Sequence, residues 1–356
     1  MALSCAGVFS HLPLVRLCGL RTNGITAGLY PLCISSQARH YSSSKVRRGI
    51  GRHIASRLQW ANNKYENFLK RRFPRFYQLY HTFVEGVKLL MQDASEVRRI
   101  KVMMHSDGVR LDQLPYRDME KLRQFRRDII KAIPLMMISI PPFANYLVFV
   151  LMYFFPRQLL IPHFWTPRQT VEYRGVYHTH RAQHHLAVLK GLEYTVGKVK
   201  DGRLQSHLKH LCTKVQSGAH PGVSEIHAVR GLFSGPPLGL RRMGVTQMRH
   251  ICPLLFLTPH LPGFLIGSRL RSHALELLML DHALLRLGPE QLSDSEIRQA
   301  CYVRGLNSDS HDIKKCREWL SQWLRMSSSL KESEVSLLLH SMVLLSANYS
   351  NSQNRR

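Results

Sequence analysis

Four histidines lie close together in the stretch "YHTHRAQHH", and neutral histidine is the commonest metal ligand in proteins. His180 and His184 are four residues apart, so a helix would place both on one face, with His178 and His185 close by. A zinc site needs about four nitrogen, sulfur or oxygen ligands in a tetrahedral array, and no H-E-x-x-H motif, cysteine or carboxylate completes one here. The pattern is more typical of a solvated basic face, and we predict no metal and no cofactor.

The chain carries none of the common catalytic motifs. It has no G-x-S-x-G, no Walker loop and no G-x-G-x-x-G, and the segment "GPPLGL" lacks the Lys-Ser/Thr pair that would hold a phosphate. We therefore predict a protein that is not an enzyme and that has no evident small-molecule substrate.

One acidic residue, Asp128, stands at the start of a long apolar segment. An ionisable group beside a membrane span is costly and often marks an ion pathway. The stronger interpretation is that Asp128 pairs with the basic residues beside it at the membrane interface. Pro141 and Pro142 could mark a broken helix of the transporter type, but one span forms no pore unless the protein assembles as a homo-oligomer.

Basic residues dominate the charge of the chain, with 50 Lys and Arg against 23 Asp and Glu and a formal net charge of +27. A surplus of this size favours anionic partners such as nucleic acid, acidic lipid or acidic protein. We predict that a basic cluster in the carboxyl-terminal half binds phosphate-rich surface in a salt-dependent way, although each residue alone is more typical of a solubilising charge. The candidates are Arg241, Arg242, Arg249, Arg269, Arg271, Arg298, Arg304, Lys314, Lys315 and Arg317.

The amino terminus has the composition of a mitochondrial transit peptide, because no acidic residue precedes Glu66 while Arg and Ser are frequent. A disordered basic arm is the alternative. The stretch "ARHYSSS" is similar to matrix-protease sites, with Arg39 third before the bond, Tyr41 just before it and Ser42 after it. We therefore predict a transit peptide at residues 1–41 and a mature start near Ser42.

A membrane segment is predicted at residues 128–157. Its uncharged stretch of about 24 residues would span about 36 Å as a helix, enough for a hydrocarbon core of about 30 Å. Pro134, Pro141 and Pro142 predict a single kinked span, because neighbouring groups or water can satisfy carbonyls freed by proline within a membrane. A buried helix of a soluble core is the alternative. With the transit peptide, the span indicates the mitochondrial inner membrane, with the outer membrane as the alternative.

The orientation of the span is not settled by charge. More Lys and Arg flank the span on its amino-terminal side than on its carboxyl-terminal side, so a positive-inside count places the amino-terminal side in the matrix.

Residues 42–127 are predicted to form a basic amphipathic helical region. Apolar residues recur there every three or four positions, a spacing that favours helix over strand. Such a helix could lie on anionic lipid or pack against its own domain. The residues with this spacing are Phe76, Leu79, Tyr80, Phe83, Val87, Leu90 and Met91.

Residues 158–350 are predicted to form a helical domain without strands, and from Gln247 onward the pattern indicates a series of capped helices. In "SDSEIRQACYVRGL", Ser293 and Glu296 have the spacing of a capping box, and Gly305 stands where a left-handed residue would end the helix. A second helix starts near Asp309. Its apolar stripe consists of Ile313, Cys316, Leu320, Trp323 and Leu324. The widely spaced cysteines beyond residue 200 indicate buried thiols in a reducing compartment.

Three segments in order make the chain similar to the LETM family, the leucine-zipper and EF-hand transmembrane proteins of the mitochondrial inner membrane. "LYHTFVEGVKLLMQDASEVRR" resembles the family's juxtamembrane stretch, and "RDIIKAIPLMMISIPPFANYLVFVLMYFFP" resembles its membrane segment. "LSDSEIRQACYVRGL" with "CREWLSQWL" resembles its E-L-x-x-A-C-x-x-R-G-M and W-L core. The resemblance covers roughly residues 75–350 and is closest to the short form without EF-hand and zipper, neither of which occurs here.

The resemblance implies an all-α fold in which one transmembrane helix precedes a helical domain of the ribosome-binding, 14-3-3-like type. It implies binding to mitochondrial ribosomes or respiratory-chain assembly factors, and a role in cation/proton balance. It also places the carboxyl-terminal domain in the matrix, and we follow it over the charge count. The EF-hand's calcium sensing is not carried over.

The function predicted is that of a non-enzymatic adaptor in the lipid bilayer of the inner membrane. Its basic domain would dock ribosomes or assembly factors and support respiratory-chain biogenesis and mitochondrial structure. The alternative is a component of a cation/proton exchange system controlling mitochondrial ion and volume homeostasis, and a third interpretation is a membrane-shaping scaffold. Residues 351–356 are predicted to form a disordered tail.

Overall fold

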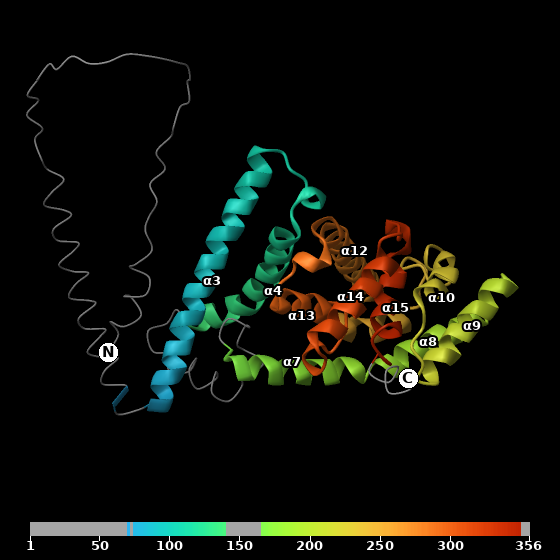
Figure 1. Cartoon of the computed structure of the whole chain (residues 1–356), viewed down its shortest axis with the longest axis horizontal. Coiled ribbons are helices and arrows are strands. Elements are labelled where there is room, and N and C mark those ends of the chain that lie inside the picture. The colour runs from blue at the N-terminus through green and yellow to red at the C-terminus, as the bar shows by residue number, and fades with distance from the viewer. Residues whose placement is uncertain (1–69, 72–73, 140–164, 350–356) are drawn as a thin grey trace, which may run out of the picture. The chain divides into compact units, whose positions relative to one another are not determined.

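The computed structural model describes residues 70–71, 74–139 and 165–349, and within these ranges every regular element is a helix (Figure 1). This confirms the all-α prediction for the described part of the chain. The chain divides into two compact units, one of residues 1–87 with 132–160 and the other of residues 88–131 with 161–356. Only short parts of the first are described, so the contacts below lie within the second.

The described elements of the second unit are α-helices and short 3-10 turns. In chain order they are α3 (Pro74–Ser106, of which residues 88–106 belong to this unit), η1 (Leu111–Gln113), α4 (Tyr116–Ser139, to residue 131), α7 (Pro167–Ala182), α8 (His185–Val196), α9 (Gly202–Gln216), α10 (Val223–Ala228), η3 (Arg230–Phe233), α11 (Val245–Ile251), η4 (Cys252–Leu255), α12 (Gly263–Leu287), η5 (Pro289–Gln291), α13 (Asp294–Val303), η6 (Ser308–Ser310), α14 (Ile313–Ser327), η7 (Glu332–Glu334) and α15 (Val335–Leu344).

The carboxyl-terminal part of α3 is amphipathic, as its spacing predicts. Leu90, Val97 and Ile100 are each less than 5% exposed, and the charged residues between them face outward. Gly108, at φ +64°, helps the chain turn back toward α4, and Lys121 of α4 then pairs with two carboxylates of α3. Residues 88–131 share one compact unit with the carboxyl-terminal helices.

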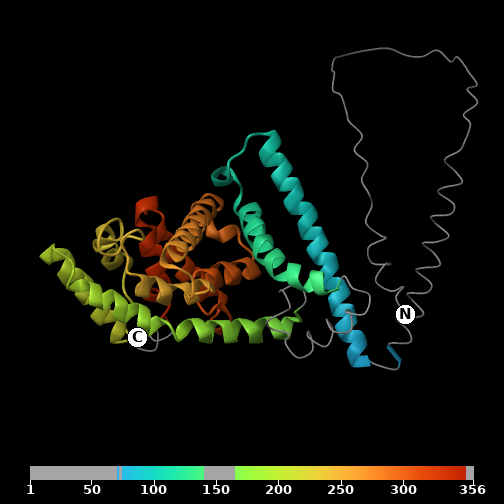
Figure 2. The same ribbon diagram turned by 180° about the vertical axis from the view of Figure 1, so that it is seen from behind.

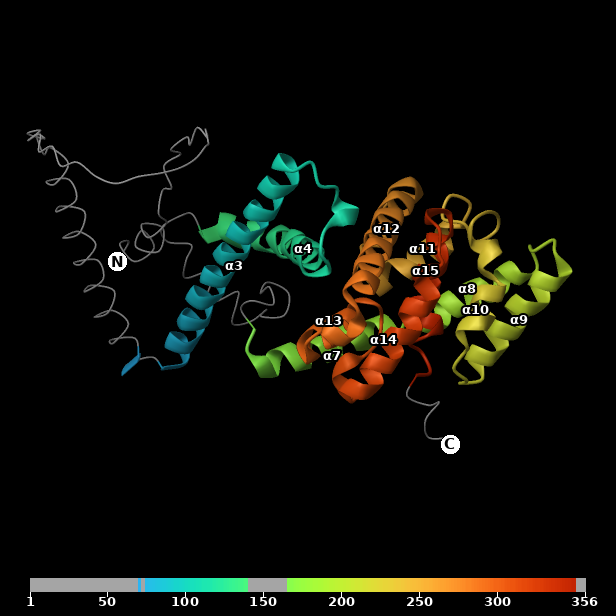
Figure 3. The same cartoon turned by 45° about the horizontal axis from the view of Figure 1, so that its top comes forward.

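Helix α15 forms the centre of the carboxyl-terminal core, because all ten of its residues are buried. It packs against α12 and α8, and α14 lies close by on α12 and α13 (Figure 3). A helix that is apolar on every face is stable only when neighbours surround it. Seen from behind, the green to yellow-green helices α7, α8 and α9 run along the lower edge of this core (Figure 2), and α8 contacts α15.

The few polar groups of α15 have partners inside the core. His340 lies with Nδ1 2.8 Å from the Ser336 carbonyl oxygen and Nε2 3.2 Å from the Gln247 amide nitrogen. That amide nitrogen also donates to the Val188 carbonyl at 3.1 Å. Nδ1 must therefore carry the proton and Nε2 must accept, so this arrangement requires neutral His340. Burial lowers the pKa of His340 to about 4, in agreement with that requirement.

The predicted capping box at the start of α13 is confirmed. The Ser293 hydroxyl accepts from the Glu296 amide at 3.4 Å, and the Glu296 carboxylate accepts from the Ser293 amide at 2.8 Å. The helix ends before Gly305, which has φ +114°, as the cap prediction requires. The next helix, α14, begins at Ile313 because the short η6 turn occupies the residues near Asp309.

Several predicted features lie wholly or partly outside the described residues. The cleavage residues Arg39, Tyr41 and Ser42 and the tail at 351–356 are among them. Of the predicted membrane segment, α4 includes 128–139 and passes through Pro134, whereas Pro141 and Pro142 lie outside. Within the described ranges no helix is both long and apolar enough to cross a bilayer.

We expect Gly305→Ala to destabilise the protein by about 1–3 kcal/mol, because a residue with a Cβ is strained at positive φ. A Cβ at this position would also lie 2.9 Å from the Met342 carbonyl oxygen of α15. Gly175→Ala in α7 is the matched control, since a Cβ there meets nothing within 4 Å, and it should stabilise by up to about 1 kcal/mol. Urea unfolding of the full chain measures both, and equal midpoints for the two variants would contradict the assignment.

The neutral state of His340 predicts a loss of stability in mild acid. The folded pKa of about 4 lies below the ordinary value of 6.5, so the unfolded state binds the extra proton between these pH values. The contribution is complete above pH 6.5 and is lost as the pH falls toward 4, by up to about 2 kcal/mol at pH 5. His340→Gln should weaken this pH dependence of the unfolding free energy, whereas His282→Gln, on the exposed side of α12, should leave it unchanged. An unaltered slope in His340→Gln would show that the imidazole does not titrate as described.

Candidate functional site: a buried ion pair and a basic pocket

A buried ion pair joins three helices of the core. Asp281 of α12 is fully buried and accepts from Arg304 Nε at 2.7 Å on one oxygen and from Trp323 Nε1 of α14 at 2.9 Å on the other. Arg304 also donates to the Ala300 carbonyl at 2.8 Å within α13. Burial alone would lower the pKa of Arg304, but the charge of Asp281 outweighs it and raises the pKa. Arg304 therefore stays ionised inside the core.

This position corrects one of the predicted surface residues. The sequence analysis placed Arg304 in the basic cluster, yet its side chain is only 1% exposed. As the residue that ends α13, it turns inward to Asp281 and so cannot contact a partner. Sequence alone does not distinguish it from the arginines around it, because its partner lies 23 residues away on another helix.

The other nine candidates fall into two groups. Arg241, Arg242, Arg249, Arg269 and Arg271 are exposed, on the segment before α11, on α11 and on α12. Arg298, Lys314, Lys315 and Arg317 lie on α13 and α14, and of these only Lys314 is fully exposed. The first group is therefore the more accessible to a partner.

Two members of the second group form contacts within the protein itself. Arg298 donates to the carbonyls of Ser308 and His311 in the loop between α13 and α14. Arg317 lies 2.9 Å from the Glu290 carboxylate and 3.8 Å from that of Asp294. These contacts explain why both side chains are half-buried.

The histidine group does not form a ligand set. His178 and His185 are half-buried with ring centroids 6.4 Å apart, and burial lowers the pKa of each to about 4. The His180 and His184 rings are neighbours, with centroids 5.3 Å apart and planes tilted by 56°, although α7 ends at Ala182 between them. In the part of the chain that the structure describes, no three His, Cys, Asp or Glu side chains converge on a metal position. The four cysteines beyond residue 200 are buried free thiols, as predicted.

A pocket of about 800 Å³ lies between α4, α7, η4, α12 and α13. Eight Lys and Arg side chains line it against four carboxylates, together with an aromatic wall. The cations are Arg117, Lys121, Arg123, Arg127, Lys131, Arg174, Arg181 and Arg269, and the carboxylates are Glu120, Asp128, Glu276 and Glu296. Of the residues predicted to act in the membrane segment, Asp128 is buried at this pocket and is engaged in an interaction.

One ion pair at the pocket is itself buried. Arg123 is 4% exposed and pairs with Glu120 one turn earlier on α4 at 2.5 and 2.8 Å, and Gln124 donates to the same carboxylate at 2.7 Å. Burial opposes the charged form of Glu120, but Arg123 outweighs it and leaves the pKa of Glu120 below its usual range. The Nη1 atom of Arg123 is buried and has no hydrogen-bond partner among the described residues.

Arg181 is buried in the aromatic wall. Its guanidinium carbon lies 4.7 Å from the ring centroid of Phe256 and 5.2 Å from that of Tyr302, and Nη1 donates to the Tyr302 carbonyl at 2.8 Å. Desolvation lowers the pKa of Arg181 to about 10. Arg127 also has a pKa of about 10, from burial and the nearby charge of Arg123. At the pocket, burial therefore destabilises the charged forms of Arg181 and Arg127.

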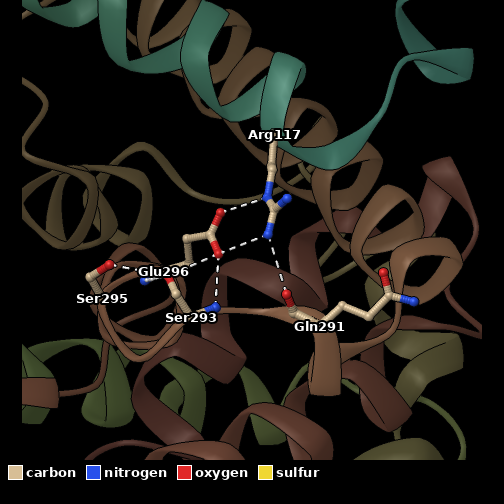
Figure 4. Close-up of polar contacts among 5 residues, drawn as sticks. All are labelled: Arg117, Gln291, Ser293, Ser295 and Glu296. Carbon is tan, nitrogen blue, oxygen red and sulfur yellow. Dashed lines mark hydrogen bonds and ion pairs between the residues drawn. The ribbon is translucent and has the colours of Figure 1, made fainter.

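Arg117 joins α4 to α13 at the edge of the pocket (Figure 4). Its guanidinium binds both oxygens of Glu296, at 2.8 and 3.3 Å, and donates to the Gln291 carbonyl at 3.3 Å. Glu296 is the same carboxylate that caps α13 through Ser293. The cap residue predicted from sequence therefore has a second role as the contact for α4.

Sequence reasoning missed most of the cations that line the pocket. Arg123 was only counted among the charges beside the span, Arg127 was also considered as a neighbour that could pair with Asp128, and Arg181 lay in the histidine-rich stretch without a role of its own. The spacing of Arg123 and Arg127, four residues apart on a helix, is a signal that they share a face. No sequence signal brings Arg181 to them, because it lies beyond the predicted span.

The helical body matches a known family. Residues 114–344 match the family model described as "LETM1-like, RBD", and the matched segment begins directly after η1 and ends with α15. The chain belongs to the LETM family. It is 55% identical over 313 residues to LETM1 domain-containing protein 1 of Xenopus tropicalis, covering 88% of this chain and 89% of the relative. The proteins of that name from Bos taurus and Homo sapiens are 47% and 46% identical over 314 residues, covering 88% of this chain and 87% of each relative. The family resemblance read from the sequence is thereby confirmed for this LETM-family chain.

We expect Asp281→Asn to destabilise the protein by about 3–5 kcal/mol, because it leaves the Arg304 charge buried without a counter-charge. The exposed pair of Glu290 and Arg317 gives the control, and Glu290→Gln should change stability by less than about 1 kcal/mol. The double variant Asp281→Leu with Arg304→Met should be more stable than Asp281→Asn, since it removes both charges. Urea unfolding of the three proteins measures the differences, and a mild effect of Asp281→Asn would contradict the role given to this pair.

Proposed function

We propose that this LETM-family chain is a non-enzymatic protein of the mitochondrial inner membrane whose basic helical domain docks mitochondrial ribosomes or respiratory-chain assembly factors. Docking would support respiratory-chain biogenesis and mitochondrial structure. The observation that carries the proposal is the family match over residues 114–344, the "RBD" of which denotes a ribosome-binding domain, combined with exposed arginines on that same body.

The membrane placement rests on sequence and family together. The acid-poor amino terminus and the uncharged stretch within residues 128–157 favour import into mitochondria and a single span. Membership of the LETM family supports association with a mitochondrial membrane. In this proposal the span is a kinked transmembrane helix, and the carboxyl-terminal helices form a domain of the ribosome-binding, 14-3-3-like type that faces the matrix.

The docking surface we propose is the exposed group on the segment before α11, on α11 and on α12. Arg241, Arg242 and Arg249 are exposed and form no ion pair with a described residue, so their charges are available to phosphate. Binding of this kind releases counterions and therefore weakens steeply as salt rises. Arg304, Arg298 and Arg317 are left out of this surface because they contact the protein itself.

The proposal predicts salt-sensitive co-sedimentation of the full chain with mitochondrial ribosomes in detergent extracts. The triple variant Arg241→Glu, Arg242→Glu and Arg249→Glu should lose most of this association, because it replaces attraction to phosphate with repulsion. A triple variant with the same change of charge, Lys190→Glu, Arg203→Glu and Lys209→Glu, uses exposed residues outside the predicted cluster and should retain it. Equal loss in both variants would indicate a non-specific effect of net charge, and no association in the wild type would refute ribosome docking.

A further inference from the structure

The basic pocket contains more positive charge than its carboxylates neutralise. All four carboxylates already have partners: Glu120 binds Arg123, Glu276 binds Arg126 at 3.4 Å and His273 at 3.6 Å, Glu296 binds Arg117, and Asp128 is also engaged. Among the described residues neither Arg127 nor Arg181 forms an ion pair. These two guanidinium groups therefore have no counter-charge within hydrogen-bonding reach in the part of the chain that the structure describes.

The pocket also contains donors without acceptors. Arg181 is 2% exposed, lines the pocket and has a buried Nε with no hydrogen-bond partner among the described residues. Buried polar atoms in native proteins are nearly always satisfied, if not by protein then by water or a bound ion. Arg123 Nη1 on α4 is likewise buried and has no hydrogen-bond partner among the described residues. Arg123, Arg127 and Arg181 line the same pocket and so form one cluster of guanidinium groups, and the charges of Arg123 and Arg181 both lower the pKa of Arg127.

An aromatic wall stands beside this cluster. Trp165, Tyr177 and Phe256 follow one another at centroid distances of 6.3 and 5.5 Å, and Lys131 Nζ lies 5.8 Å from the Tyr177 ring. Phe256 and Ile130 are exposed by 39% and 63% although they line the pocket. Tryptophan and tyrosine beside basic residues are the side chains found at the level of lipid headgroups. An inorganic phosphate ion has no apolar part that could contact these rings, whereas a phospholipid does.

The chain brings both ends of the predicted membrane segment to this pocket. Arg127 directly precedes residues 128–157, Lys131 lies at their start, and Trp165 follows them by eight residues. Basic pockets at the ends of membrane spans are known sites for phosphate-bearing lipid headgroups.

We propose that the pocket binds the phosphate group of an anionic phospholipid, with Arg123, Arg127 and Arg181 donating to its oxygens and the aromatic wall contacting its glycerol region. The bound phosphate supplies the acceptors that Arg123 and Arg181 lack. The inference rests on the membrane segment of the proposed function, but not on docking to ribosomes.

The test uses the full chain in neutral detergent, titrated with phosphatidylglycerol, phosphatidylcholine or inorganic phosphate, with bound lipid counted by native mass spectrometry. The wild type should bind phosphatidylglycerol about tenfold or more tightly than phosphatidylcholine, and inorganic phosphate should not displace it. Arg181→Gln and Arg127→Gln should each weaken phosphatidylglycerol binding about tenfold, because a charge-assisted hydrogen bond is lost. Arg127 is less deeply buried than Arg181, so Arg127→Gln decides the question if Arg181→Gln does not fold.

Arg168→Gln is the matched control, since Arg168 is exposed on α7 near the same end of the predicted span and does not line the pocket. It should change binding by less than twofold. Equal binding of the two lipids, wild-type affinity in Arg127→Gln, or displacement by inorganic phosphate would overturn the lipid assignment. Release of the intact chain from mitochondria by alkaline carbonate would instead refute the proposed membrane segment, and loss of ribosome association alone would leave the pocket assignment standing.

Discussion

The buried pair of Asp281 and Arg304 is the contact on which the rest of the helical body depends. It joins α12 to the end of α13, and Trp323 of α14 binds the same carboxylate, so three helices share one charge. A buried ion pair contributes little net stability, but removing one partner is strongly destabilising because the other charge stays buried without a counter-charge. Both residues are therefore needed at these positions. Arg304 thereby fixes where α13 ends and where the loop to α14 begins. Apolar packing alone would allow these helices more freedom to slide.

The charges continue from this centre toward the pocket. Tyr116, the first residue of α4, is buried beside Arg304, and burial raises the pKa of Tyr116 to about 12 despite that positive charge. Glu120 and Arg123 follow on the next turn, where the charge of Arg304 helps to lower the pKa of Glu120. The core thus dictates the position of α4, and α4 in turn presents Arg123 and Arg127 to the pocket. Arg181 comes to the same place from α7, on the other side of the predicted span.

The sequence predicted local structure well, because caps and helical spacing depend on residues a few positions apart. Ser293, Glu296 and Gly305 marked both ends of α13, and the stripe through Trp323 marked the buried face of α14. The ordered motifs were also enough to identify the family. The predictions that concern the membrane segment and the transit peptide lie mostly outside the described residues and stay predictions.

What the sequence could not predict were contacts between distant residues. Arg304 was grouped with the surface arginines because its partner is on another helix. Arg181 had no role predicted from the sequence because its ring contacts come from residues 256 and 302. The second role of Glu296 was hidden for the same reason, since Arg117 is 179 residues away. Spacing shows which side chains share a helix face, but not which helix lies opposite.

The central claim is that this helical body holds both flanks of the predicted span at the level of lipid headgroups. The most direct measurement is quenching of Trp165 fluorescence in vesicles by lipids brominated near the headgroup, taken as the difference between the full chain and its Trp165→Phe variant. Our account predicts that headgroup-proximal bromine quenches Trp165 strongly and that aqueous iodide quenches it weakly. Strong quenching by iodide with no effect of the brominated lipids would contradict it.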